Sequence, residues 1–148
     1  MLTFDYTFTV RAPLGTVAEF HRDTRALKRL TPPPIFTQLH KVDPLGEGSV
    51  SEFTLWFGPL PVRWTAAHSN VDSQRGFTDT QTRGPLKRWR HTHRFTAESA
   101  GLTRIREHVE YEHYAGRRGL LSRLLFARPA LWMLFLYRQW ATRRALER

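Results

Sequence analysis

The sequence contains no cysteine, which excludes a disulfide, a thiolate zinc site and a cysteine nucleophile. The fold therefore needs no oxidising compartment. Residues 1–13 also lack the basic region and the apolar core of a signal peptide, and we expect a cytoplasmic protein, free or at a membrane surface. The chain has no glycine-rich phosphate loop, no Walker pattern and no serine nucleophile elbow, so the common nucleotide-binding and hydrolase motifs are missing.

Acidic residues are scarce in the second half of the chain. Residues 1–82 carry 8 basic and 8 acidic side chains, whereas residues 83–148 carry 15 basic and 5 acidic ones and hold the whole net charge of +10. Such asymmetry can indicate a nucleic-acid or an anionic membrane partner. The arginines are dispersed instead of clustered in one block, which favours a solvated basic face and argues against nucleic acid.

The 148 residues are 41% hydrophobic and 13% aromatic, which is typical of a folded protein with a sizeable core. No internal repeat and no low-complexity linker divides them. We therefore expect a single domain over residues 1–148.

The chain is predicted to begin with a strand and two short helices. From Phe4 to Val10, aromatic and β-branched residues alternate with polar ones, as in a half-buried strand. Pro13 suits the first turn of a helix, and a second short helix is expected around residues 26–30. The run Thr-Pro-Pro-Pro at 31–34 ends it, because prolines cannot continue a helix.

The next part of the chain is almost entirely predicted as strand, with short turns rich in glycine and proline. Parallel strands would need long crossovers, so these turns indicate an antiparallel meander. The six expected strands cover residues 35–42, 49–57, 60–72, 76–83, 86–97 and 102–114.

Residues 119–148 are predicted as one long helix or two collinear helices, because Pro129 either kinks the run or restarts it as a first-turn residue. Residues 130–137 carry no charge and are apolar all round, which is typical of a helix buried on more than one side. The curved sheet is expected to wrap this helix. The uncharged run is too short to span a bilayer.

We expect one face of this helix to lie on the sheet and a second apolar face to need another cover. The first face comprises Ala130, Leu134, Tyr137, Ala141 and Ala145, whereas Trp132, Phe135 and Leu136 should point elsewhere. Two partners are open for the second face: a second copy of the chain, or an anionic membrane. In the membrane alternative, phosphates would meet Arg123, Arg128, Arg138, Arg143 and Arg144.

These elements predict an α+β protein in which a curved antiparallel sheet of about seven strands grips a long C-terminal helix, with two short helices after the first strand. This helix-grip geometry tends to leave a concave apolar cavity between sheet and helix.

Short motifs along nearly the whole chain resemble the START-like (SRPBCC) helix-grip superfamily, which includes plant pathogenesis-related allergens, polyketide cyclases and lipid-transfer domains. The similarity is greatest to its small bacterial single-domain members. The resemblance implies a hydrophobic ligand cavity and supplies no catalytic signature. The residues that carry it are Val10-Arg11-Ala12-Pro13, Val17, Phe20-His21-Arg22-Asp23, Ala26-Leu27, Leu30-Thr31-Pro32-Pro33, Gly58-Pro59, Trp64, Gly76-Phe77, Gly84-Pro85 and Trp89-Arg90-His91-Thr92-His93-Arg94-Phe95.

Two histidines lie on the predicted inner face of the sheet. In the strand over residues 86–97, period two places His91 and His93 on the face of Trp89 and Phe95. The arginines of this strand occupy the opposite face and must meet water. The histidine face should therefore look inward.

Carboxylates are expected beside these histidines. Glu107 lies on the inner face of the following strand, and Asp79 and Gln81 on the preceding one can join the group. His21 and His40 have no evident partner and are expected at the surface or the rim.

Four interpretations of this polar group stay open. Its histidines can be structural, bonded to Glu107 or to water; they can orient a ligand; they can perform acid–base catalysis with Glu107; or two histidines and Glu107 can bind a metal. The His-x-His spacing is a weak metal signal without a third defined ligand, so we expect neither a metal nor a cofactor.

The favoured hypothesis is a non-enzymatic module that binds a hydrophobic small molecule or a lipid in the cavity. One alternative is a cyclase- or dehydratase-like enzyme that uses His91, His93 and Glu107 as acid–base groups. Another is a docking module that uses its basic face and apolar C-terminal helix on a membrane or a protein. The predicted ligand-binding residues are Trp56, Trp64, Phe77, Asp79, Gln81, Trp89, His91, His93, Phe95, Glu107, Tyr111, Met133, Leu134 and Tyr137.

Overall fold

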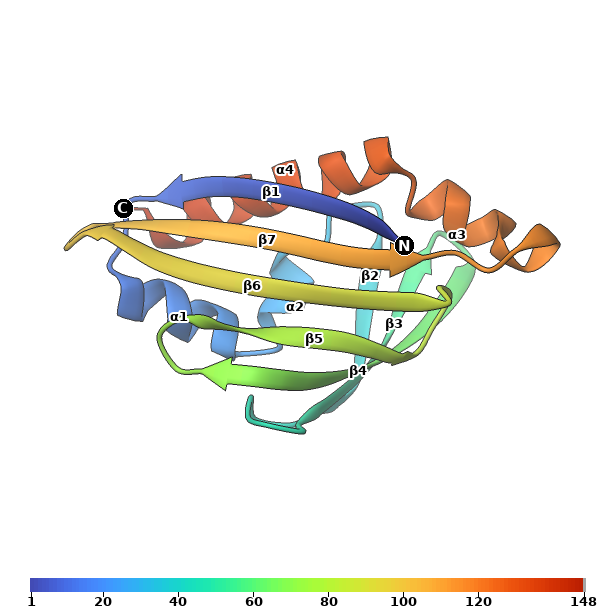
Figure 1. Ribbon diagram of the computed structural model, residues 1–148, viewed down its shortest axis with the longest axis horizontal. Coiled ribbons are helices and arrows are strands. Elements are labelled where there is room, and N and C mark those ends of the chain that lie inside the picture. The colour runs from blue at the N-terminus through green and yellow to red at the C-terminus, as the bar shows by residue number, and fades with distance from the viewer. Residues whose placement is uncertain (148) are drawn as a thin grey trace.

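The computed structural model describes residues 1–147, and its strands form one antiparallel sheet (Figure 1). Their order is β1-β7-β6-β5-β4-β3-β2, so β2 to β7 form a meander and β1 pairs with β7. The seven strands and their antiparallel arrangement are as predicted. The strands are β1 (Leu2–Val10), β2 (Phe36–Val42), β3 (Val50–Phe57), β4 (Leu60–Asp72), β5 (Gly76–Arg83), β6 (Arg88–Ser99) and β7 (Leu102–Glu112).

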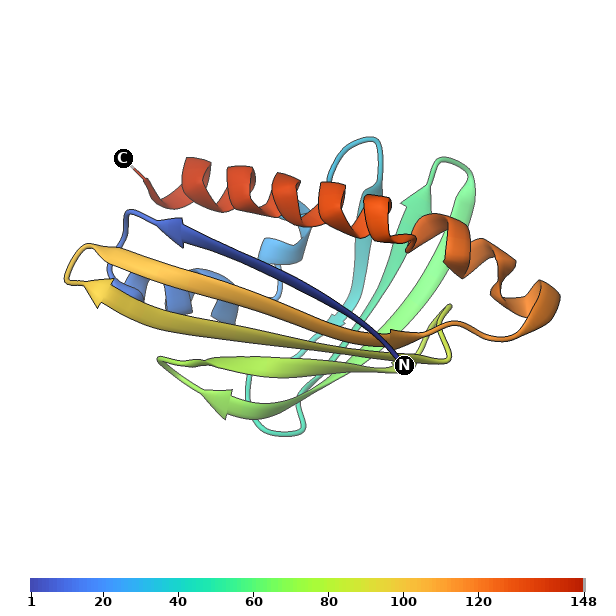
Figure 2. The same cartoon turned by 45° about the horizontal axis from the view of Figure 1, so that its top comes forward.

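Short helices follow the first strand, and longer ones end the chain. Two helices, α1 (Leu14–Arg22) and α2 (Ala26–Arg29), connect β1 to β2. After β7 come the 3₁₀ turn η1 (Gly116–Gly119) and the helices α3 (Leu120–Leu125) and α4 (Arg128–Leu146). Figure 2 shows α4 running along the sheet, while the far strands β2 to β4 turn up toward it. The predicted helix-grip arrangement is confirmed.

The C-terminal segment is two helices, so the second of the two predicted alternatives holds. Phe126 closes α3 by donating its N–H to the carbonyl of Ser122, and α4 then begins at Arg128. Pro129 lies in the first turn of α4, where no intrahelical hydrogen bond needs its missing N–H. The predicted end of the helix at residue 148 lies outside the described residues.

The predicted inner face of α4 is confirmed in part, since Ala130, Leu134 and Tyr137 face the space between helix and sheet. The residues that pack most deeply on the sheet, however, lie beside this face. Leu131 and Phe135, four residues apart, are fully buried, and Phe135 stacks on Phe4 of β1 with ring centroids 5.5 Å apart. The prediction that Phe135 points away is wrong, because a helix apolar all round does not reveal its rotation. Trp132 and Leu136 are exposed, as expected.

Candidate functional site

A cavity of about 590 Å³ lies between the concave face of the sheet, α2 and α4. Alternate residues of four neighbouring strands reach it, because side chains two apart on a strand share a face. From the strands these are Ser51, Phe53, Leu55 and Phe57 on β3, Trp64, Ala66 and His68 on β4, Phe77 and Asp79 on β5, and Trp89, His91 and His93 on β6. From α4 they are Ala130, Leu131, Met133, Leu134, Tyr137 and Arg138.

Most of the residues predicted to bind a ligand line this cavity. Met133 is 67% exposed and so lies at its rim. The predicted residues in the lining are Trp64, Phe77, Asp79, Trp89, His91, His93, Met133, Leu134 and Tyr137.

Trp56 and Gln81 lie outside the cavity lining. The neighbours of Trp56 on β3 face the cavity, so Trp56 points to the outer face, where its Nε1 donates to Gln38 Oε1 at 3.0 Å. Gln81 instead joins the ends of β5 and β6. Its Nε2 donates to the carbonyl of Leu86 at 2.7 Å, and its Oε1 accepts from the N–H of Leu86 at 3.2 Å.

Three further predicted residues also lie outside the lining, and all three are buried. Phe95 packs against His21, with ring centroids 4.9 Å apart, and Tyr111 against Trp89, with ring centroids 6.2 Å apart. Glu107 contacts the histidines of β6 from the neighbouring strand β7 and so supports the cavity wall.

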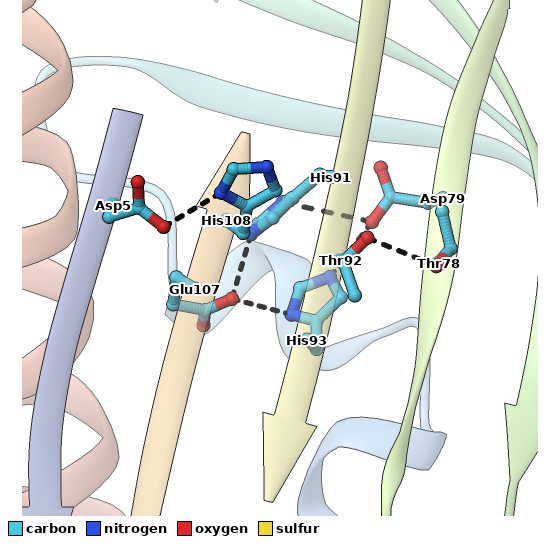
Figure 3. A network of polar contacts seen from close by, with 8 residues as sticks. All are labelled: Asp5, Thr78, Asp79, His91, Thr92, His93, Glu107 and His108. Atoms are coloured by element: carbon cyan, nitrogen blue, oxygen red, sulfur yellow. Dashed lines mark hydrogen bonds and ion pairs between the residues drawn. The ribbon is translucent and has the colours of Figure 1, made fainter. Parts of the chain in front are cut away.

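The predicted group of histidines and carboxylates is present, and it is a connected network (Figure 3). His91 Nε2 lies 2.7 Å from Glu107 Oε2, and His93 Nε2 lies 2.8 Å from Asp79 Oδ2. His93 Nδ1 lies 3.0 Å from the same Glu107 oxygen, a charge contact outside hydrogen-bond alignment. His91 Nδ1 and Asp79 Oδ2 are 3.8 Å apart. His93 thus lies between two carboxylates.

Strand register brings these four residues together. Glu107 of β7 is directly opposite His93 of β6, and His91 is directly opposite Asp79 of β5. Directly opposed side chains on one face of an antiparallel pair lie close together. The network therefore follows from strand pairing, and no loop is needed to assemble it.

Burial and mutual contact set the charge of each member. Burial alone would lower the pKa of His93, but Glu107 and Asp79 outweigh it and raise the pKa to about 9. Burial, together with the charge on His93, lowers the pKa of His91. Burial would raise the pKa of Glu107 and of Asp79, yet the histidines hold both pKa values below their usual range. At neutral pH the network contains two carboxylates, a charged His93 and a neutral His91.

These charges define the chemistry available to His91. An ionised Glu107 can only accept a hydrogen bond, so neutral His91 carries its proton on Nε2 and leaves Nδ1 unprotonated. Nδ1 could take a proton from a bound molecule, and Glu107 would stabilise the resulting cation. The geometry thus permits acid–base chemistry at the cavity wall.

In the structure, Asp79 is a third candidate metal ligand beside the two histidines, a position that the sequence did not define. Asp79, His91 and His93 each offer a ligand atom, and these atoms lie within 4.8 Å of one another. Metal ligation requires an unprotonated histidine nitrogen. The charged His93 is already engaged with Asp79 and Glu107, so the arrangement fits an ion-pair network better than a metal centre.

His21 was predicted at the surface or rim, but it is buried. It belongs to α1, its ring contacts that of Phe95, and its Nδ1 is 2.9 Å from the carbonyl of Val17. Burial lowers the pKa of His21 to about 4, so the ring is neutral at physiological pH. Its position one helical turn from Val17, a fully buried residue, is the sequence signal that would have placed it inside.

Arg138 was predicted to meet membrane phosphates, but it lines the cavity. Its Nε is buried and has no hydrogen-bond partner within residues 1–147. Burial lowers the pKa of the guanidinium, while the charges of Glu107 and Asp79 favour its protonated form. Sequence reasoning missed this role because the rotation of α4 was not determined.

A curved antiparallel sheet that grips a C-terminal helix around an apolar cavity defines the helix-grip class of proteins. Comparison with solved structures shows that the chain has the START-like (SRPBCC) form of this fold. No family model matches the sequence, and no curated protein matches it.

Three solved structures illustrate this similarity. A Chromobacterium violaceum protein has a TM-score of 0.80 at 13% identity, covering 100% of this chain and 99% of its own. A START superfamily protein of Mycobacterium smegmatis has a TM-score of 0.73 at 11% identity, covering 98% of this chain and 97% of its own. The Zhui aromatase/cyclase of Streptomyces sp. R1128 has a TM-score of 0.68 at 20% identity, covering 97% of this chain and 90% of its own.

Proposed function

We propose that this protein binds a hydrophobic small molecule or lipid in the cavity between the sheet and α4, as a cytoplasmic carrier. The proposal rests on one observation. The cavity of about 590 Å³ has mainly apolar and aromatic walls, and the network of histidines and carboxylates lies at one part of these walls. This volume and this lining are typical of ligand pockets. Neighbours described as a START superfamily protein and an aromatase/cyclase support the general character of the cavity.

Native mass spectrometry of the freshly purified protein, followed by organic extraction, tests this proposal. We expect a stoichiometric adduct of defined mass. Replacing Ala66, a small buried residue in the cavity wall, by Phe should remove the adduct, because the new ring occupies the cavity. The control is Ala97→Phe at an exposed position of β6, and this variant should retain the adduct. Equal adducts in both variants would place the bound molecule elsewhere.

The network at the cavity wall favours a second function, acid–base catalysis of the cyclase or dehydratase kind. His91 presents an unprotonated Nδ1, and Glu107 holds the opposite nitrogen. Replacing Glu107 by Gln should then abolish turnover of the extracted molecule while sparing its binding. Loss of binding and turnover to the same degree would count against catalysis.

The surface of α3 and α4 favours loading from a membrane. Trp132, Leu136 and Trp140, spaced four residues apart, form an exposed apolar stripe, and exposed Met133 connects it to the cavity rim. Apart from Arg138, which lines the cavity, residues 116–147 contain six arginines and one acidic residue, which suits an anionic surface.

We propose that the C-terminal segment contacts the surface of the membrane and does not cross the bilayer. By length and composition alone, residues 116–146 could cross a bilayer. In this fold, however, the segment is divided among η1, α3 and α4, and α4 holds Leu131 and Phe135 in the core.

A further inference from the structure

Arg138 of α4 is a half-buried cation on the cavity wall, and its buried Nε makes no hydrogen bond within residues 1–147. Glu107 and Asp79 act on the guanidinium through their charge alone. A buried donor without a partner is costly, and the cost is larger for a charged group. Because this donor lies in a ligand cavity, an acceptor on the ligand would supply the missing hydrogen bond.

The carboxylates of the network are already engaged. Glu107 accepts from His91 and contacts His93, and Asp79 accepts from His93. Both carboxylates thus have partners without Arg138, although the 3.0 Å contact of His93 Nδ1 with Glu107 Oε2 is not an aligned hydrogen bond. Within residues 1–147, Arg138 Nε is left beside the network as a buried donor without an acceptor.

The charge balance narrows the class of acceptor. Glu107 and Asp79 are negative, whereas His93 and Arg138 are positive, so these four charges cancel in the absence of a ligand. A ligand carboxylate would add an uncompensated negative charge to a buried site, which is costly. An uncharged carbonyl oxygen satisfies the guanidinium and leaves the balance unchanged.

We infer that Arg138 is the residue that recognises the polar end of the bound molecule, and that this end is an uncharged carbonyl oxygen on an apolar body. This inference rests on the proposed binding function and specifies its ligand class. Arg138 then donates a charge-assisted hydrogen bond to the carbonyl, which is stronger than one between neutral groups. The aromatic walls hold the apolar body and supply no discrimination between polar ends.

Three naphthalenes of matched shape test the inference: 2-ethylnaphthalene, 2-acetylnaphthalene and 2-naphthoate. Affinities are measured at pH 7 by quenching of tryptophan fluorescence, since Trp64 and Trp89 line the cavity. We expect the acetyl compound to bind about tenfold more tightly than the ethyl compound, the difference made by one hydrogen bond to a charged group. Naphthoate should bind less tightly than the acetyl compound.

Variants identify the donor. Arg138→Met should remove the preference for the carbonyl while keeping affinity for 2-ethylnaphthalene. Arg138→Lys preserves the charge but not the planar fork, so it should retain only part of the preference. It also serves as the test if the Met variant does not fold. The control is Arg94→Met on the exposed outer side of β6, which should behave like the natural protein.

The outcomes separate this inference from the proposed function. Binding of the ethyl compound without any preference for the acetyl compound would overturn the role of Arg138 and leave the carrier proposal standing. Failure of all three naphthalenes to bind, together with no adduct in native mass spectrometry, would contradict both. Tightest binding of naphthoate, lost in Arg138→Met, would overturn the charge-balance argument and assign a carboxylate ligand.

Discussion

His93 holds its proton between two carboxylates, the buried Glu107 and the half-buried Asp79, and the three charges depend on one another. Asp79 and Glu107 remain ionised in the interior because His93 is charged, and His93 is charged because both carboxylates contact it. Removing one member of such a network leaves a buried charge without its partner, which is more costly than removing the whole network. Stability at this site should therefore follow pH.

At alkaline pH, the change of the free energy of unfolding with pH is expected to reflect the deprotonation of His93. Its pKa is about 9 in the folded protein and about 6.5 when unfolded, so its contribution is complete below pH 6.5. As pH rises through 9, the folded protein releases this proton and the contribution is lost. Urea denaturation between pH 6.5 and 10 should show stability falling in the natural protein and falling less in His93→Gln. Parallel profiles would contradict the assignment.

His21 is expected to make the protein less stable at acidic pH, whereas His93 affects its stability at alkaline pH. Its pKa is about 4 when folded and about 6.5 when unfolded, so between these values the unfolded chain binds a proton that the folded one does not. Stability therefore falls as pH falls through this window, by roughly 3 kcal/mol in total. His21→Phe should show a shallower loss in denaturation experiments below pH 6.5. Above pH 6.5 the two profiles should run parallel; a difference confined to that range would refute the role of His21.

The sequence predicted the network better than the other polar residues, and the reason is strand geometry. Period two and short turns determine which face a side chain takes and which neighbours oppose it, so Asp79, His91, His93 and Glu107 could be brought together. Arg138 and His21 lie on helices, where the rotation against the sheet is determined by tertiary packing.

At the scale of elements, the fold depends on the way in which α4 packs over β1. The sequence of α4 shows no dominant apolar face, because tryptophan, leucine and methionine also occur on its exposed side. Binary patterning consequently predicted the existence of the helix and the place of Pro129, but it assigned Phe135 to the wrong side. The element was predictable, but its rotation was predicted only in part: Leu134 and Tyr137 line the cavity as expected, whereas Phe135 does not point away from the sheet.

Two substitutions one residue apart on α4 test the observed rotation. Phe135 is fully buried against Phe4 and His91, so Phe135→Ala should lower the free energy of unfolding by about 3–5 kcal/mol. Leu136 is 40% exposed, and Leu136→Ala should change the free energy of unfolding by less than about 1 kcal/mol. Urea denaturation measures both. The reverse order would restore the rotation predicted from the sequence.

At the scale of the whole molecule, the excess of arginine and the exposed apolar residues fall on the same segment as the cavity rim. Under the proposed loading from a membrane, this coincidence would account for part of the charge asymmetry without nucleic acid. A protein that takes its ligand from a lipid surface needs an apolar contact close to the entrance and a positive charge that favours anionic lipids. In the proposed arrangement, Met133 and the neighbouring stripe on α4 would provide the contact, and the arginines of this segment would provide the charge.

Co-sedimentation with vesicles tests this arrangement. The protein should bind vesicles that contain phosphatidylserine, bind neutral phosphatidylcholine vesicles weakly, and dissociate as salt is raised, because screening weakens the attraction. Replacing Trp132 and Trp140 by Ser should reduce binding at least about tenfold, since tryptophan anchors at the membrane interface, while keeping naphthalene binding in solution. Leu2→Ser on β1, exposed but outside α3 and α4, is the control and should have no effect. A dimer in light scattering without lipid, disrupted by the same Trp132 and Trp140 changes, would instead show that a second copy covers the stripe.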